Sequence, residues 1–168
     1  MKRCILIVCF AFSSIANAAI LPFELPWMNA EEPGTTYKSS DHPGAVFVLE
    51  VFGLNCSYCN DNVPRVHSLV KFYESNKLVQ ILDVGTDTSD TNYFRWIDRH
   101  HPTYPVLKDA TRSIYKQLGT SGIPSTAVVD CTGKLQHVSM GVWSSSTVAN
   151  IKAAVARSLA LPACKVQE

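Results

Sequence analysis

Two cysteines separated by two residues, Cys56-Ser57-Tyr58-Cys59, are the residues of this chain best suited to chemistry. They follow an apolar run over residues 45–52 and precede a segment with a helical pattern, which has Val63, Val66, Val70 and Tyr73 on one face. A cysteine at a helix N-terminus lies near unpaired backbone N–H groups and the positive end of the helix dipole, which favour the nucleophilic thiolate. The second cysteine, about one turn further on, can close a disulfide with the first. We therefore predict a redox pair in which Cys56 attacks and Cys59 resolves.

Zinc binding is the first alternative for this cysteine spacing. A structural zinc site needs two further Cys or His ligands at short spacing. His67 lies two turns along the predicted helix, too far from its N-terminus to join the pair. The adjacent His100 and His101 diverge by about 100° on a helix and are predicted to be surface residues. The sequence therefore predicts neither a metal ion nor another cofactor.

A second element supports the redox interpretation. Gly122-Ile123-Pro124-Ser125-Thr126 lies just before an apolar segment over residues 127–129 that is typical of a strand. Proline is a poor member of a strand ladder. Its position is explained if its peptide bond is cis and faces another group, whereas an ordinary turn proline is the alternative.

These elements resemble the thioredoxin fold, and more narrowly its exported TlpA/ResA/DsbE-like branch. The resemblance rests on Cys-x-x-Cys after a strand, Gly-x-Pro-x-Thr before a late strand and Asp130-x-x-Gly133 after it, and it covers roughly residues 21–159. It implies that Pro124 is cis, packs against the disulfide and leaves the backbone at Ile123 free to pair with an extended client segment. Pro64 matches the kinked active-site helix of the family.

The resemblance also suggests how to interpret two residues near the cysteine pair, Asn55 and Glu50. Asn55 stands where the family usually has tryptophan, which alters the expected fit of the substrate and leaves the chemistry unchanged. Glu50, six residues before Cys56, stands where thioredoxins have a buried aspartate. A solvated side chain at the strand edge is the alternative. If Glu50 is buried, desolvation raises its pKa and it can exchange protons with Cys59.

The N-terminal 18 residues have the features of a secretory signal peptide. Lys2 and Arg3 precede an apolar stretch over residues 5–12, and Ala16-Asn17-Ala18 fits the cleavage rule. The apolar stretch is too short to span a bilayer, although a retained anchor is an alternative. Cleavage after Ala18 removes two positive charges and two cysteines, so the formal charge changes from +1 to −1 and six cysteines become four. We therefore expect a periplasmic or otherwise exported protein.

The remaining sequence predicts one α/β domain, a thioredoxin-like three-layer sandwich with a central mixed sheet and helices on both faces. Residues 19–44 form an N-terminal hairpin or extension, residues 45–160 the thioredoxin-like domain and residues 161–168 a C-terminal tail. The predicted helix over residues 91–101 has Tyr93, Phe94 and Ile97 on its inner face, and Trp143 is assigned no role. The predicted core consists of Val46, Val48, Val51, Leu69, Ile81, Val84, Val128 and Val138.

The two other cysteines that remain after cleavage are Cys131 and Cys164. In the topology that the resemblance implies, the turn holding Cys131 lies at the end of the sheet opposite the active site. The final helix, over residues 146–159, runs toward that end, so Cys164 arrives near Cys131. We predict a structural disulfide between them, with two unpaired thiols as the alternative.

The predicted function is thiol–disulfide exchange, and the sequence leaves the direction of electron flow open. The resemblance implies a reductase of client proteins with cysteine pairs, for example in cytochrome c maturation, that is itself reduced by a membrane protein. Tyr58 before the second cysteine is found in isomerase-like and glutaredoxin-like pairs, so an oxidase or isomerase is the alternative. Tyr58 is also a candidate for contact with the client protein.

A Cu(I) carrier is the alternative from another class, because thiolates suit Cu(I). Related copper carriers, however, have three residues between the cysteines and use a distant histidine. A near-neutral chain gives no electrostatic basis for nucleic-acid binding. Residues 19–44 are too few for a separate dimerisation domain, so we expect a monomer.

Overall fold

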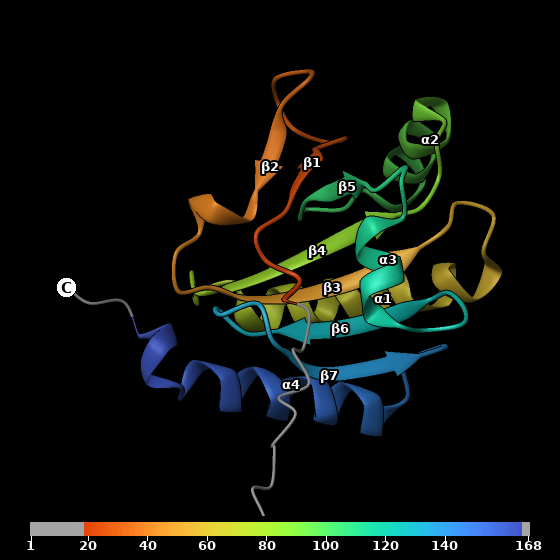
Figure 1. Cartoon of the computed structure of the whole chain (residues 1–168). Helices are drawn as coiled ribbons and strands as arrows, with labels where there is room; N and C mark the ends of the chain where they lie inside the picture. Colours follow the sequence, from red (N-terminus) through yellow and green to blue (C-terminus); the bar gives the residue numbers. More distant parts are fainter. Residues whose placement is uncertain (1–18, 166–168) are drawn as a thin grey trace, which may run out of the picture.

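The computed structural model describes residues 19–165, which form a five-stranded mixed sheet covered by helices and a small two-stranded sheet beside it (Figure 1). The predicted signal peptide and residues 166–168 lie outside the described residues. The small sheet pairs β1 (Glu24–Pro26) with β2 (Thr36–Lys38). The large sheet contains β3 (Val46–Phe52), β4 (Val79–Gly85), β5 (Val106–Lys108), β6 (Ser125–Val129) and β7 (Leu135–Met140).

The large sheet has the strand order β5-β4-β3-β6-β7, with β3 at its centre. β3 pairs in parallel with β4 and antiparallel with β6, so the sheet is mixed as predicted. Every residue of β3 is buried, as expected for an apolar strand covered on both faces. The predicted α/β sandwich is confirmed.

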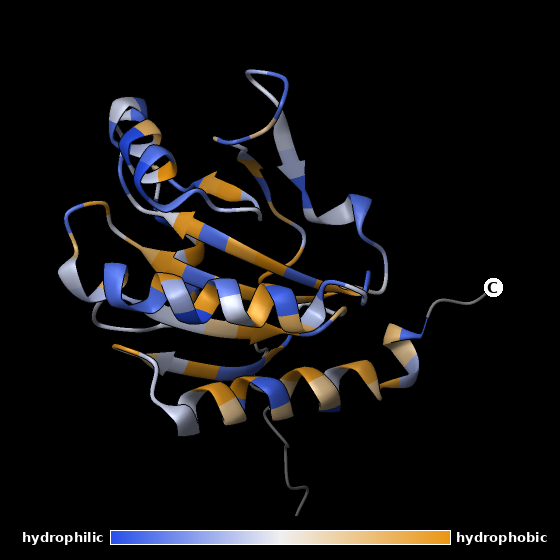
Figure 2. Ribbon diagram, turned by 180° about the vertical axis from the view of Figure 1, so that it is seen from behind, coloured by the Kyte–Doolittle hydropathy of each residue, from blue (hydrophilic) through white to orange (hydrophobic). Residues whose placement is uncertain are grey.

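The helices cover the two faces unequally. They are α1 (Ser57–Tyr73), α2 (Asp90–His100), α3 (Ser113–Leu118) and α4 (Ser145–Leu159). Figure 1 shows α3 in front of the sheet, and Figure 2, from behind, shows α1 and α4 covering the opposite face. Val46 and Val48 pack with α1 and α4, whereas Phe47 and Leu49 pack with α3 and the N-terminal segment. No helix within residues 19–165 has the length and hydrophobicity needed to cross a bilayer.

Two predicted core positions are wrong. Val138 is 37% exposed because it lies on β7, which is the edge strand of the sheet. Phe94 is 58% exposed, and Trp96 is buried in its place. The residues of α2 that face the core are Tyr93, Trp96 and Ile97, spaced three and four positions apart, and Phe94 is rotated away from them by about 100°. The other predicted core residues are buried.

Candidate active site

The Cys56–Cys59 pair lies where β3 passes into α1. Cys56 is the N-cap of α1, and its Sγ accepts a hydrogen bond from the backbone N–H of Cys59 at 3.2 Å. The two cysteines form a disulfide with their Cα atoms 5.2 Å apart. Cys56 is half-buried, whereas Cys59 is buried in a cluster with side chains of α1 and α2. An incoming sulfur can therefore reach Cys56 far more easily than Cys59.

The proline loop lies directly beside this disulfide. The Ile123–Pro124 peptide bond is cis, and the carbonyl oxygen of Ile123 lies 3.9 Å from the Cys56 Sγ. Pro124 itself is buried, and its carbonyl oxygen accepts a hydrogen bond from the Gly141 N–H at 2.8 Å. The structure thus brings residues 56 and 123–124, far apart in the chain, to one site.

The surface around the disulfide is open and carries both apolar and polar side chains. Tyr58 is 64% exposed, and Met140, whose sulfur lies beside Gly122 of the proline loop, is also exposed. A pocket of about 390 Å³ borders Cys56 and includes Ile123, Asp87 and Arg112 in its lining. An extended protein segment could therefore lie across Cys56 on this surface.

Glu50 is buried beneath α1, which excludes the solvated alternative. It is 3% exposed, and it accepts hydrogen bonds from the Asn62 side-chain amide at 2.7 Å and the Thr126 hydroxyl at 2.5 Å. Burial, its largest influence, raises the pKa of Glu50 to about 8, although both hydrogen bonds oppose the rise. A carboxyl group of this kind holds its proton near neutral pH and can exchange it.

Two residues that support Glu50 were missed by sequence reasoning. The Asn62 side-chain oxygen accepts the Trp143 backbone N–H at 2.8 Å, and the Trp143 indole N–H donates to the Thr126 Oγ1 at 2.6 Å. Together they close a buried network around the carboxyl group. Asn62 could have been noticed as a polar residue among the inward-facing positions of α1, between Cys59 and Val66.

Glu50→Gln should stabilise the protein increasingly as the pH rises. The unfolded group loses its proton near pH 4.5 and the folded group near pH 8. Its stabilising contribution is therefore fully present below about pH 4.5 and lost as the pH rises through about 8. Between pH 6 and pH 9 the variant should gain on the order of 2 kcal/mol over the wild type in free energy of unfolding. Urea unfolding at both pH values measures this gain, and parallel pH dependence of the two proteins would contradict it.

Cys131 and Cys164 form the second disulfide, with Cα atoms 5.4 Å apart. Cys131 lies in the turn between β6 and β7, at the end of β6 opposite Pro124. Cys164 is buried in a short 3-10 helix, Pro162–Cys164, that follows α4. This bond is therefore remote from the exchange site.

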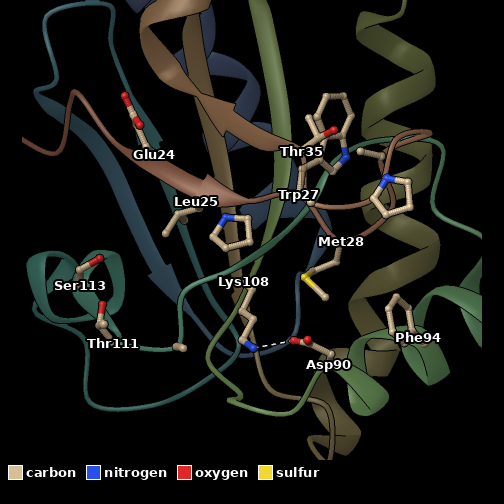
Figure 3. A pocket seen from close by; sticks show the side chains of 15 residues that line it. Glu24, Leu25, Trp27, Met28, Thr35, Asp90, Phe94, Lys108, Thr111 and Ser113 are labelled. Carbon is tan, nitrogen blue, oxygen red and sulfur yellow. Dashed lines mark hydrogen bonds and ion pairs between the residues drawn. The ribbon is translucent and has the colours of Figure 1, made fainter.

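A pocket larger than the one beside Cys56 contains no cysteine in its lining. It has a volume of about 710 Å³ and lies between the N-terminal sheet and the segment that follows β5 (Figure 3). Trp27, Met28 and Phe94 give it an apolar lining, and an ion pair joins Lys108 Nζ to Asp90 Oδ1 at 2.5 Å. Nothing in this lining identifies a ligand, so we assign the pocket no role.

Comparison with known proteins agrees with the fold and with the cysteine motif. Relatives include the thiol-disulfide oxidoreductase ResA of Geobacillus thermodenitrificans, 23% identical over 68% of this chain and 66% of that protein. Another is the thiol:disulfide interchange protein DsbE of Pseudomonas aeruginosa, 23% identical over 77% of this chain and 69% of that protein. A thioredoxin-family thiol:disulfide interchange protein from Chlorobium tepidum has a similar structure, with a TM-score of 0.68 and 19% identity, covering 84% of this chain and 95% of that one.

The family assignment rests on the length of the match. The model of the AhpC/TSA family matches residues 16–138, which include the cysteine pair, Glu50 and the proline loop. This is well over half of the chain. The chain therefore belongs to the AhpC/TSA family and has the thioredoxin-like fold of its relatives.

Proposed function

We propose that the protein is an exported thiol–disulfide oxidoreductase that reduces disulfides of client proteins. The observation that carries the proposal is the position of Cys56. Cys56 is half-buried at the N-terminus of α1, its sulfur is bonded to the buried Cys59, and that sulfur lies beside the carbonyl group of Ile123. A helix N-terminus stabilises the thiolate, which is the nucleophile in disulfide exchange.

The reaction follows from this geometry. The Cys56 thiolate attacks one sulfur of a client disulfide, and the other client sulfur leaves as a thiolate that takes a proton from solvent. Cys59 then loses its proton and attacks Cys56, so that the second client sulfur leaves and the Cys56–Cys59 disulfide forms. Glu50, buried beneath α1, is the group we assign to accept the Cys59 proton.

The remaining parts of the proposal concern partners and location. Ile123 and Tyr58 contact the client, Ile123 through its backbone and Tyr58 through its exposed ring. A membrane protein that carries electrons from the cytoplasm returns the pair to its reduced form. The protein acts as a monomer in the periplasm or outside the cell, a location supported by the signal-like residues 1–18.

An oxidase or isomerase is the competing activity, favoured by the exposed Tyr58 between the cysteines. The redox potential of the Cys56–Cys59 pair, measured by equilibration with glutathione or dithiothreitol, separates the possibilities. A value near that of thioredoxin, about −270 mV, is expected for a reductase. A value near −120 mV would contradict the proposed direction and indicate an oxidant.

The copper-carrier alternative is tested by turnover. The protein should accelerate the reduction of insulin by dithiothreitol, because the exchange reaction needs only the cysteine pair and an accessible client disulfide. Cys131 and Cys164 should not contribute, since they lie at the far end of β6. Stoichiometric Cu(I) binding without acceleration would instead support a carrier.

A further inference from the structure

A second carboxyl group lies beside Glu50 in the protein interior. Asp83 of β4 is the register partner of Glu50 on β3, so the two side chains leave adjacent strands on the same face of the sheet. Adjacent strands are about 5 Å apart. Asp83 is 2% exposed, and its neighbours on this face come from α2 and from the segment before β5. The site therefore contains two carboxyl groups buried next to each other.

All the donors that reach this pair are neutral. Asp83 Oδ2 accepts hydrogen bonds from the Trp96 indole N–H and the Tyr104 hydroxyl, both at 3.3 Å. Within residues 19–165, no lysine or arginine forms an ion pair or hydrogen bond with either carboxyl group. The other titratable side chains that pack around the residues of this pair are Cys59, His67, Tyr93 and His100. The remaining charged residues of α1 and α2 are exposed: Asp61, Arg65, Lys71, Asp90, Arg95, Asp98 and Arg99.

In the part of the chain that the structure describes, none of the four titratable side chains around the pair forms a hydrogen bond or ion pair with Glu50 or Asp83. Cys59 is held in the disulfide, and the Tyr93 hydroxyl donates to the Asp87 carbonyl oxygen at 3.2 Å. The His67 ring packs edge-on against Tyr104, and the His100 ring contacts Trp96 and has its Nε2 2.8 Å from the Asn60 side-chain oxygen. Two negative charges at this spacing, without a cation, repel strongly in an interior that excludes water.

We propose that Asp83 is a positioning residue for disulfide exchange, because it and Glu50 form one carboxyl pair that carries a single negative charge when Cys59 resolves the mixed disulfide. The inference rests on the proposed function. Asp83 does not touch the sulfurs and acts through Glu50. By its charge, it sets the pH at which Glu50 becomes free to accept a proton.

The direction of the pKa shift at each group agrees with this pairing. Burial raises the pKa of Asp83 to about 7 and that of Glu50 to about 8, and the negative charge of Asp83 contributes to the rise at Glu50. Groups coupled in this way lose their protons in two steps that belong to the pair. Near neutral pH the pair therefore retains one proton and has one carboxylate available as a base.

The carboxyl pair accepts the proton of Cys59 when Cys59 attacks the mixed disulfide. The Cys59 Sγ–H bond breaks and its proton goes to the carboxylate of the pair, while its electron pair forms the Cys59–Cys56 bond. The bond between Cys56 and the client sulfur breaks, and its electrons leave with the client as a thiolate. The pair is then fully protonated and returns one proton to solvent before the next cycle.

The titration of Glu50 in Asp83→Asn tests the proposal without any client. Carbon NMR of the oxidised protein, with glutamate labelled at the carboxyl carbon, follows this group, and Glu50→Gln identifies its signal. Asparagine keeps an acceptor for Trp96 and Tyr104 and removes the charge. The midpoint of Glu50 should fall by about one pH unit or more. Asp130→Asn, in the turn after β6, is the matched control and should leave the midpoint in place.

A second variant, Tyr104→Phe, tests the same proposal in case Asp83→Asn does not fold. Tyr104→Phe removes the hydroxyl that stabilises ionised Asp83, so Asp83 holds its proton more firmly and more of the negative charge moves to Glu50. The Glu50 midpoint should again fall. An unchanged midpoint in both folded variants, or in Tyr104→Phe alone if Asp83→Asn does not fold, would overturn the proposal.

Kinetics link the pair to the exchange step. A reduced protein mixed with an aromatic disulfide releases one coloured thiolate when Cys56 attacks and a second when Cys59 resolves. Below the wild-type midpoint, Asp83→Asn should accelerate the second phase up to about tenfold for each pH unit by which the Glu50 midpoint falls, with the first phase unchanged. Equal pH profiles for the second phase would overturn the role of Asp83. A protein that releases neither thiolate would overturn the proposed function instead, while the NMR titration still decides whether the carboxyl groups are paired.

Discussion

Cys56→Ser is expected to reduce disulfide exchange to the uncatalysed rate, whereas Cys59→Ser is expected to accumulate mixed disulfides with clients. The two cysteines have opposite environments. Cys56 is the N-cap of α1 and is half-buried, and Cys59 lies one turn inward and is buried. A serine hydroxyl is not ionised at neutral pH and forms no disulfide, so without Cys56 the first attack cannot occur. Without Cys59, the first attack occurs but nothing releases the client.

Trapping experiments measure this difference directly. Each single variant, expressed in a cell that exports it, is separated on non-reducing gels, and complexes that disappear on reduction are counted as mixed disulfides. A variant lacking both Cys131 and Cys164 controls for the number of thiols and should behave as the wild type does. Equal trapping by Cys56→Ser and Cys59→Ser would contradict the assignment of Cys56 as the nucleophile.

The sequence predicts the centre of this molecule well because its signals there are local. An apolar run with one charged residue predicts the central strand β3, and the cysteine pair directly after it marks the start of α1. The serine run at 144–146 includes the N-cap of α4, where the Ser144 side chain accepts the Thr147 N–H. Local patterns of this kind depend on backbone geometry and on periodicity, both of which can be read from neighbouring residues.

What the sequence could not provide depends on contacts between distant segments. The sequence leaves open whether Glu50 is buried or solvated, because the residues that surround it, Asn62, Thr126 and Trp143, come from distant segments. The pairing of Asp83 with Glu50 depends on the register between β3 and β4, and no local pattern specifies that register. Val138 was misplaced for the same reason, because only the strand order shows that β7 is an edge.

The variant with alanine at both Cys131 and Cys164 should melt lower than the wild type and keep its exchange activity. The disulfide joins cysteines 33 residues apart. In the chain-entropy model, opening such a loop in the unfolded state lowers the free energy of unfolding by about 3–4 kcal/mol. For a domain of this size, that corresponds to a fall of about 10 °C in Tm. Activity should persist because the bond is at the end of the sheet opposite Pro124.

The bond joins the segment after α4 to the turn between β6 and β7. Cys164 lies in the short 3-10 helix after α4, and Cys131 lies in a turn whose Asp130 side chain accepts backbone N–H groups from Thr132 and Lys134. The backbone N–H of Ile20 also donates to the Gly133 carbonyl oxygen at 2.9 Å, so the start of the described chain is anchored at the same turn. Loss of the bond should therefore loosen the two ends of the domain together.

The effect of this bond can be separated from that of the active-site pair. In a Cys56→Ser/Cys59→Ser background, Cys131–Cys164 is the disulfide that remains within the described residues, so the fall in Tm on adding dithiothreitol measures this bond alone. That fall should match the one caused by the two alanines, because both remove the same constraint on the unfolded chain. Hydrogen exchange should quicken at the C-terminal end of α4 and near Ile20, and remain unchanged in β3. Free thiols at both positions in the oxidised protein, found by mass spectrometry, would contradict the prediction.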